Sequence, residues 1–488
     1  MVIILYILQR IFNLKNNDLS VHILMAFFVI LLGLSLYRRY KKKILEAADI
    51  EIAVIVVGCI MRLGYMLYTP CNVRSNDMWE FSLDGHGHAG YILGIMLEHH
   101  LPQTNDLQFY QQPLYYLMAS LQSFFVNLPF GFDDMFYLVD SGKLVSFYSS
   151  CITLVYVRNI INLYGIKDKT ARIIALCIPC FVPIGFITAG MISTDAITFM
   201  FMVLAFYYTH VWYKNSSWKY TIVLAVIYGL GILTKISVGV VAIYTAFVFL
   251  YKLIRTKEKG KILIKLLAFG LISFPMGLWF SLRNYLRFGQ KLTYVLDQDH
   301  DSLMYTGDIP LINRFLIPNV HTLIRPFLDL AGNDYNFIVS YIKSSMFGVH
   351  SLALYNWVVY PLFYASVLIA LILMVAFVYY VVMLIRKKTG KMEWSLVVMT
   401  VLFLMSMISF YYNYPFICVL DFRYYMFLLI PLSVILGKVA ERKEMKVFRT
   451  ITADCLAFYC LLSFTLCFTL FSVNEMINSE DLTFFLQE

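Results

Sequence analysis

Long apolar runs set the strongest limit on what this chain can fold into. About twelve of them are long enough for a helix to cross the hydrocarbon core of a bilayer, which is about 30 Å thick. Unpaired backbone groups are too costly in hydrocarbon, so each run must be helical. The runs are 21–38, 50–69, 143–163, 172–192, 197–213, 219–234, 236–253, 265–282, 355–384, 394–412, 424–438 and 450–472. We therefore predict an all-α polytopic membrane protein, in which the stretch 1–13 is either an interfacial helix or a further span.

Composition and charge agree with this prediction. Of the 488 residues, 60% are hydrophobic and 14% are charged, whereas a soluble domain carries about 25% charged residues. The net charge of +9 comes largely from basic clusters between the spans, at 38–43, 167–172, 255–261, 386–391 and 441–446. Placing all of these clusters in the cytoplasm satisfies the positive-inside rule. They therefore anchor the topology, and we expect no nucleic-acid partner.

The same topology leaves two long segments on the outer face of the membrane, at about 70–142 and 283–354. Long loops are where function concentrates. The apolar segment after Pro113 cannot be a full crossing without breaking the alternation of sides, so we predict an interfacial or re-entrant helix there. We divide the chain into an N-terminal membrane segment (1–49), a catalytic transmembrane module (50–440) and a final span with an outer tail (441–488).

The stretch "SLDGHGHAGY" (82–91) is the most polar part of the first outer loop. Asp84, His86 and His88 could supply three metal ligands, but no second cluster completes a site with recognisable spacing. Asp84 could instead act as a general base, with the glycines leaving room for a substrate close to the backbone. A solvated loop without chemistry is the third interpretation.

Other polar residues lie at the outer ends of spans. Asp195, in "TAGMISTDAITFM", is costly so close to hydrocarbon and is a functional candidate, although Ser193, Thr194 and Asp195 could also simply cap a helix. Lys235 could reach toward the membrane interface or bind a phosphate. Two arginines, Arg283 in "LRNYLRFGQK" and Arg423 in "LDFRYYMF", also lie on the outer side. Cations at this surface suit a lipid phosphate or pyrophosphate.

The order of these features resembles the GT-C superfamily of integral-membrane glycosyltransferases. It is most similar to the branch that holds the protein O-mannosyltransferases and the lipid A aminoarabinose transferase. The motifs that carry the resemblance are Arg62 in a span, "DGHGHAGYI", Leu101-Pro102, "QQPLYY", Asp195-Ala196, "LTK" (233–235), "RNY..FG" (283–289) and "RYY" (423–425). They extend over about 50–440. Gln112 departs from the family, which often has a proline at this position, and the glycine-spaced histidines replace a glutamate found in other branches.

This resemblance implies a GT-C-like bundle whose two large outer loops carry interfacial helices. It implies inverting transfer of a sugar from a polyprenyl-phosphate donor to a hydroxyl of a glycan, lipid or protein, on the extracytoplasmic or lumenal side. The catalytic residue would be Asp84, with Asp77 as the alternative. Residues implied to bind substrate or lipid phosphate are His86, His88, Tyr91, Asp195, Lys235, Arg283, Arg423 and Tyr424. No cofactor is required, although a divalent cation at Asp84 and Asp195 stays open.

Two other functions use similar sequence features. A transporter or flippase of lipid-linked sugars would also have many spans, but it predicts polar residues deep in several spans. Here they crowd the outer span ends, and no half-chain repeat is apparent. A polymerase or ligase of surface polysaccharide would use a lipid-pyrophosphate donor and a large late outer loop, for which 283–354 is long enough.

Overall fold

The computed structural model describes residues 2–11, 18–78, 80–292, 294–296, 298–318, 320–350, 356–386 and 391–469. These residues contain helices and loops but no strand, apart from one isolated bridge between Tyr305 and Phe416. The predicted apolar runs are largely helical where the structure describes them, and the all-α polytopic prediction is confirmed. Among the described residues, ten helices are long and apolar enough to cross a membrane, or eleven if one bent pair counts as a span, whereas the sequence predicted about twelve. The helix at 218–234 is shorter, at 17 residues.

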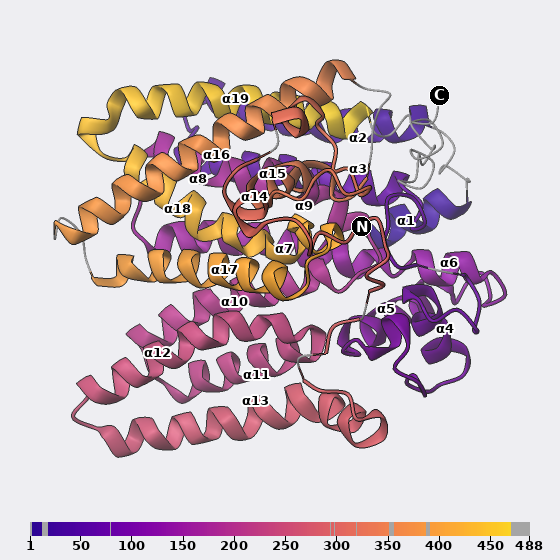
Figure 1. The fold of residues 1–488 in the computed structure, drawn as a ribbon. Coiled ribbons are helices and arrows are strands. Elements are labelled where there is room, and N and C mark those ends of the chain that lie inside the picture. Colours follow the sequence, from indigo (N-terminus) through magenta and orange to yellow (C-terminus); the bar gives the residue numbers. More distant parts are fainter. Residues whose placement is uncertain are drawn as a thin grey trace. The chain divides into compact units, whose positions relative to one another are not determined.

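The chain divides into two compact units. The first comprises residues 1–8, 70–156 and 188–297. Within it, α11 packs against α10 and α13, and α4 packs against α5 (Figure 1). Its helices are α4 (His88–Leu97), α5 (Leu114–Asn127), α6 (Met135–Asp140), most of α7 (Lys143–Leu163), α10 (Asp195–Lys214), α11 (Trp218–Thr234), α12 (Gly239–Arg255) and α13 (Lys259–Phe288), with the 3-10 turns η2 (Leu107–Tyr110), η3 (Thr188–Gly190) and η4 (Ile236–Val238).

The second unit comprises residues 9–69, 157–187 and 298–488. Within it, α8 packs against α3 and α18, and α16 packs against α18 and α19 (Figure 1). Its helices are α2 (Asp18–Lys41), α3 (Ala47–Tyr68), α8 (Lys169–Phe181), α9 (Pro183–Ile187), α14 (Leu311–Phe315), α15 (Phe337–Phe347), α16 (Asn356–Ile385), α17 (Trp394–Asn413), α18 (Leu429–Ala440) and α19 (Lys446–Thr469). The 3-10 turns in this unit are η5 (Val320–Ile324), η7 (Lys391–Glu393), η8 (Ile417–Leu420), η9 (Phe422–Leu428) and η10 (Lys443–Met445).

The predicted span at 172–192 is broken. Helices α8 and α9 meet at Pro183 and are bent by 55°. Proline has no N–H, so Pro183 cannot donate to the carbonyl of Pro179 four residues earlier. The guanidinium of Arg62, which is 2% exposed, donates to this carbonyl at 3.1 Å and to that of Cys180 at 2.9 Å. Arg62 therefore stabilises the C-terminal end of α8, where a cation is also favoured by the helix dipole.

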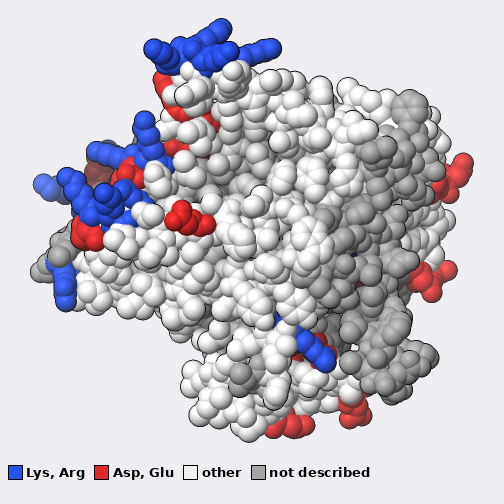
Figure 2. Space-filling model, turned by 90° about the horizontal axis from the view of Figure 1, so that it is seen from above, with Lys and Arg blue, Asp and Glu red and all other residues white. Residues whose placement is uncertain are grey.

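On the face shown in Figure 2, charged residues gather into a few clusters, and wide areas are uncharged. In the second unit, the carboxylate of Glu51 is 4% exposed and pairs with Arg158 and Arg172. Lys438 pairs with Glu393 at 2.9 Å in the same unit. Charged side chains near the ends of spans generally pair with an opposite charge, and these carboxylates pair with basic residues.

The N-terminal helix α1 (Val2–Ile11) has 10 residues and would rise only about 15 Å, which is too short for a span. Tyr6 on this helix is 1% exposed, and its hydroxyl donates to the carboxylate of Asp140. The other oxygen of Asp140 accepts from the Cys71 N–H at 2.9 Å and from Lys143 at 2.9 Å. This buried cluster fixes the start of the chain within the first unit.

Helix α5 begins directly after Pro113, as predicted. One of its faces, which includes Tyr115, Tyr116 and Ala119, is buried. The opposite face exposes apolar side chains, among them Leu121 at 59% and Phe125 at 63%. With 14 residues and no charge, α5 is too short to cross a bilayer and has the character of an interfacial helix.

The late outer segment of the second unit contains a buried ion pair. Lys343 on α15 donates to both carboxylate oxygens of Asp334, at 2.7 and 2.8 Å, and both side chains are almost fully buried. Burial raises the pKa of the Asp334 carboxyl and lowers that of the Lys343 amine, against the attraction between them. Ser340, on the first turn of α15, also donates to the Asp334 carbonyl at 2.8 Å. Asp334 therefore connects the segment before α15 to two residues of this helix.

Candidate active site

The glycine-rich stretch of the first loop folds back on itself. The N–H of His88 donates to the carbonyl of Asp77 at 2.9 Å, and α4 begins at His88. A Cβ atom on Gly90 would lie 1.5 Å from the Gly85 carbonyl oxygen, and one on Gly85 would lie 2.6 Å from that of Glu80. The prediction that the glycines leave room for a substrate is therefore wrong for these two positions, where the close approach is made by the loop's own backbone.

Both candidate carboxylates of this loop are exposed. Asp84 makes no hydrogen bond or ion pair with any residue that the structure describes. Asp77 has a positive φ of 58°, which is unusual outside glycine, and its carboxylate interacts electrostatically with the phenol of Tyr116. Strained backbone of this kind is often found at functional sites. Asp84 is thus the more accessible carboxylate, and Asp77 lies nearer to the buried polar residues.

The two histidines have different surroundings. His86 is half-exposed, stacks on Phe109 with ring centroids 4.7 Å apart, and lies 3.7 Å from the carboxylate of Asp106. His88 is 3% exposed and forms a 2.7 Å hydrogen bond from Nδ1 to the hydroxyl of Tyr116. Within the described ranges, no group of three or more His, Cys, Asp or Glu residues is arranged to hold a metal ion. Asp84, His86 and His88 are therefore not gathered into one group of three ligands in the described structure.

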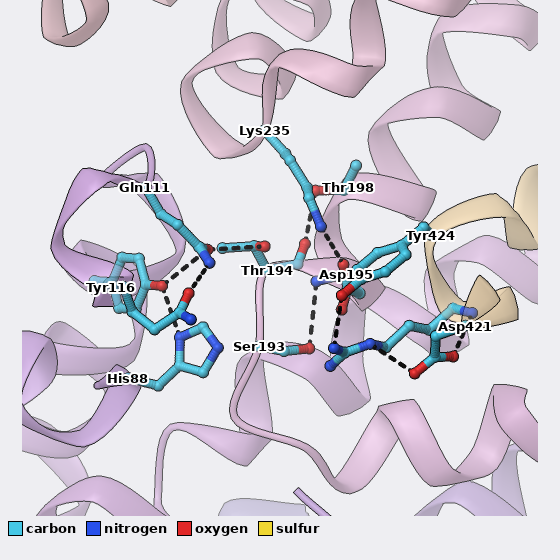
Figure 3. Close-up of polar contacts among 12 residues, drawn as sticks. His88, Gln111, Tyr116, Ser193, Thr194, Asp195, Thr198, Lys235, Asp421 and Tyr424 are labelled. Atoms are coloured by element: carbon cyan, nitrogen blue, oxygen red, sulfur yellow. Dashed lines mark hydrogen bonds and ion pairs between the residues drawn. The ribbon is translucent and has the colours of Figure 1, made fainter. Parts of the chain in front are cut away.

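A network of buried aromatic and amide side chains packs against the glycine-rich stretch of the first loop. The rings of Tyr91 and Tyr116 stack with centroids 3.7 Å apart. The Tyr116 hydroxyl donates to Oε1 of Gln111 at 3.0 Å, and the Thr194 hydroxyl reaches the same oxygen at 3.4 Å. Burial raises the pKa of both tyrosines, so both phenols stay neutral at physiological pH. The network joins the first outer loop to the turn before α10 (Figure 3).

That turn carries the Asp195–Lys235 pair. Asp195 is the first residue of α10, where the helix dipole favours a carboxylate. Lys235 follows the last residue of α11, and its Nζ lies 2.6 Å from Oδ1 of Asp195 (Figure 3). The side chain of Asp195 is 5% exposed and that of Lys235 is 31% exposed. Ser193 accepts the N–H of Asp195 at 3.3 Å, but Thr194, the N-cap residue, makes no capping hydrogen bond with its side chain.

The end of α13 binds the first loop. Arg283 donates to the carbonyl of Pro102 and, at 2.8 Å, to Oδ1 of Asn284. Gln112 donates to the hydroxyl of Ser281 at 2.8 Å. The guanidinium of Arg283 thus contacts a peptide carbonyl and a side-chain amide. Its role in phosphate binding stays a prediction. The "RNY" motif and the "LP" motif of the sequence are thereby brought together.

The second unit holds Arg423 and Tyr424. Arg423 is 7% exposed, donates to the Tyr424 hydroxyl at 2.8 Å and lies 3.0 Å from the carboxylate of Asp421 (Figure 3). Asp421 also accepts the N–H of Arg423 at 3.0 Å as it caps η9. The loop position of Gly348, whose φ is 61°, brings that residue close to the Asp421 carboxylate. This cluster fixes a guanidinium near the start of the η9–α18 span.

Sequence reasoning missed three members of these clusters. Gln111 and Tyr116 lie within the quoted "QQPLYY" motif, which could have indicated them, but no role was assigned to either. Asp421 directly precedes the "FRYY" stretch. It lies two residues before Arg423, and the two side chains meet in the turn at the start of η9. The pairing of Asp195 with Lys235, forty residues apart, has no local signal.

Taken together, the apolar helices define a multi-pass membrane protein, and each of its two units carries polar clusters near helix ends. Residues 137–279 match the model of a family described as dolichyl-phosphate-mannose-protein mannosyltransferase. This match supports the resemblance to GT-C glycosyltransferases, and with it a glycosyltransferase activity. The matched stretch includes Asp195 and Lys235, but it ends before Arg283. A comparison with curated proteins gave no match.

Proposed function

We propose that this protein transfers a sugar from a polyprenyl-phosphate donor to an acceptor hydroxyl at the extracytoplasmic membrane surface, with inversion at the anomeric carbon. The matched family is described by a dolichyl-phosphate-mannose donor, so mannose is the first sugar to test. The positive-inside rule supports the side of the membrane. The acceptor is a glycan, lipid or protein hydroxyl.

The Asp195–Lys235 pair is the observation that carries this proposal. A lysine with a 31% exposed side chain, held by a buried carboxylate at an outer helix end, is a fixed point charge. Such a charge suits the phosphate of a lipid donor. When the glycosidic bond to phosphate breaks, negative charge grows on the phosphate oxygen, and a preorganised cation stabilises it. Lys235 is the proposed phosphate ligand, and Asp195 is the residue that positions it.

The base would come from the first loop. The acceptor hydroxyl loses its proton to a carboxylate as its oxygen bonds to the anomeric carbon, and the bond from that carbon to the donor phosphate breaks. Asp84 is the proposed base, because it is exposed and corresponds to the acidic residue of the resembled motif. Asp77 is the competing carboxylate, because it interacts with Tyr116.

The remaining predicted residues have supporting roles in this scheme. His88 and Tyr91 hold the loop through Tyr116 and Gln111. His86, which is half-exposed, is a proposed sugar contact. Arg283 in the first unit is proposed to add positive charge for the donor phosphate. The binding roles of Arg423 and Tyr424, which belong to the second unit, stay predictions. No metal ion has a role in the proposal.

The test is a transfer assay with purified protein in liposomes that contain radiolabelled polyprenyl-phosphate mannose and a hydroxyl acceptor. Asp84→Asn should lower the rate by about 10²–10⁴-fold, the usual contribution of a general base. Asp133→Asn is the matched control, since Asp133 is another exposed carboxylate of the same loop. Loss in Asp77→Asn with full activity in Asp84→Asn would move the base to Asp77. Full activity in both variants would remove the first loop from the mechanism.

A further inference from the structure

Helix α19 carries a carboxylate deep inside a membrane span. Asp454 is eight residues from Lys446, where α19 begins, and fifteen from Thr469, where it ends. At 1.5 Å per residue it lies about 12 Å from one end of the helix and about 22 Å from the other. Arg449, which pairs with Asp168 at 2.9 Å, anchors the cytoplasmic end. Asp454 therefore lies within the hydrocarbon region, where a charged side chain costs about 2.5–3.5 kcal/mol.

Asp454 also has no partner for its carboxylate. It forms no hydrogen bond or ion pair with the residues that the structure describes, and its side chain is exposed. Glu51, which is also on a span of this unit, shows the usual solution, because it is buried and is bound by two arginines. Ionisable residues inside a membrane are rare and generally pair with another polar group. An exposed acidic side chain in a span therefore lacks the polar partner that such side chains generally have.

The surface around Asp454 is a groove between α16 and α19. Pro361, Tyr364, Ala365 and Leu368 line it from α16, and Cys455 and Phe458 flank Asp454 on α19. Its volume is about 450 Å³. Small side chains such as Ala365, which is 9% exposed, and Cys455 let α16 and α19 approach each other closely, as small residues do at helix contacts in membranes.

The exposed side of α16 has the spacing of a helix-packing seam. Its exposed side chains include Tyr364, Leu368, Leu371, Val375 and Val378, each 44–57% exposed. Steps of four, three, four and three residues place them in one line along the helix, in the heptad pattern of helix pairs. The seam begins at the groove, so a helix lying along it would pass over Asp454.

The carboxylate in the groove determines which kind of molecule can bind there. Lipid tails and a prenyl chain are apolar and would leave the carboxylate without a partner, and lipid head groups do not reach this depth. A second copy of this chain lacks the complement, because the exposed Lys and Arg residues of the described spans lie near helix ends. We propose that the α16–α19 groove binds a transmembrane helix of another protein, and that this helix carries a basic side chain that pairs with Asp454.

A binding assay with designed peptides tests the proposal. The full chain is labelled with a fluorescence donor and reconstituted in phosphatidylcholine liposomes. The acceptor-labelled probes are leucine- and alanine-rich peptides of about 20 residues, long enough to span, with Lys or Leu at the central position. Energy transfer should show at least tenfold tighter binding of the Lys peptide, and Asp454→Leu should abolish this preference.

Two further variants control for trivial causes. Asp454→Leu/Leu461→Asp moves the carboxylate two turns along α19, outside the groove, and should not restore the preference. Asp454→Leu alone should melt no lower than the wild type, because it removes an unpaired carboxylate from an apolar surface. The proposal is overturned if the Lys and Leu peptides bind equally, if Asp454→Leu lowers the melting temperature, or if Asp454-dependent energy transfer occurs between two copies of this chain.

Discussion

Replacing Arg62 by Met should destabilise the second unit through the broken span. The substitution keeps an unbranched side chain in the space beside Gly185 but removes the donors to the carbonyls of Pro179 and Cys180. A buried polar group that loses its partner costs about 1–3 kcal/mol. Two such groups give about 2–6 kcal/mol, and part of this is offset because a guanidinium no longer has to be buried. The expected loss is therefore about 2–4 kcal/mol.

A second substitution tests the cause of this loss. Pro183→Ala restores an N–H that can donate to the Pro179 carbonyl, as in a continuous helix. In the Arg62→Met background it should recover about 1–3 kcal/mol, whereas in the wild type it should change stability little, because Arg62 already satisfies that carbonyl. Gly185 is left unchanged in every variant.

The measurement is reversible unfolding of the purified variants in mixed micelles with increasing SDS, followed by tryptophan fluorescence. A double-mutant cycle gives the coupling between Arg62 and Pro183. Additive effects would refute the assignment of Arg62 as the partner of the carbonyl that Pro183 leaves free. So would a loss below about 0.5 kcal/mol in Arg62→Met, since that is the range of ordinary surface changes.

Four further outcomes follow from the clusters described above. Lys235→Ala should lower the transfer rate by about 10²-fold or more while Lys235→Arg keeps part of it, because the charge beside Asp195 serves the phosphate; equal rates in initial-velocity assays would contradict this. Tyr116→Phe removes two buried hydrogen bonds and should cost about 1–3 kcal/mol in SDS unfolding, and an unchanged midpoint would argue against the network. Lys343→Met should cost about 3–5 kcal/mol, whereas Asp334→Leu/Lys343→Met should come within about 1 kcal/mol of wild type; a double variant as weak as the single one would count against the pair. Dialysis against EDTA should leave the transfer rate unchanged, and a loss that Mg²⁺ or Mn²⁺ restores would show that a metal ion takes part.

Hydropathy alone predicted the spans because their signal is local and strong. Each apolar run is a stretch of sequence that must be helical in lipid, and Pro113 marked the start of α5 by its own geometry. The break at Pro183 was missed because the run 172–192 is almost entirely apolar after Arg172. Arg62, which binds the carbonyls at the break, lies more than a hundred residues earlier.

The candidate site was predictable as a set of residues and not as a set of contacts. Asp195 and Lys235 were each indicated by their cost near hydrocarbon, but their pairing depends on how α10 and α11 pack. For the glycines, the sequence suggested a contact that the structure does not have. Their spacing predicted room for a substrate, but Gly85 and Gly90 lie close to the loop's own backbone. Asp454 was overlooked because one acidic residue barely lowers the hydropathy of a long run, and only the packing of α16 and α19 shows that it faces outward.

The contact between Tyr6 and Asp140 has a consequence for synthesis. Asp140, the partner of Tyr6, is translated 134 residues after it. Contacts this distant in sequence form slowly, because a long loop must close first. The first helix must therefore wait in the membrane interface, with Ile4 and Ile11 available for lipid contact, until α6 has been inserted. Pulse-labelled truncations ending before and after Asp140 should differ sharply in how far this helix is protected from protease.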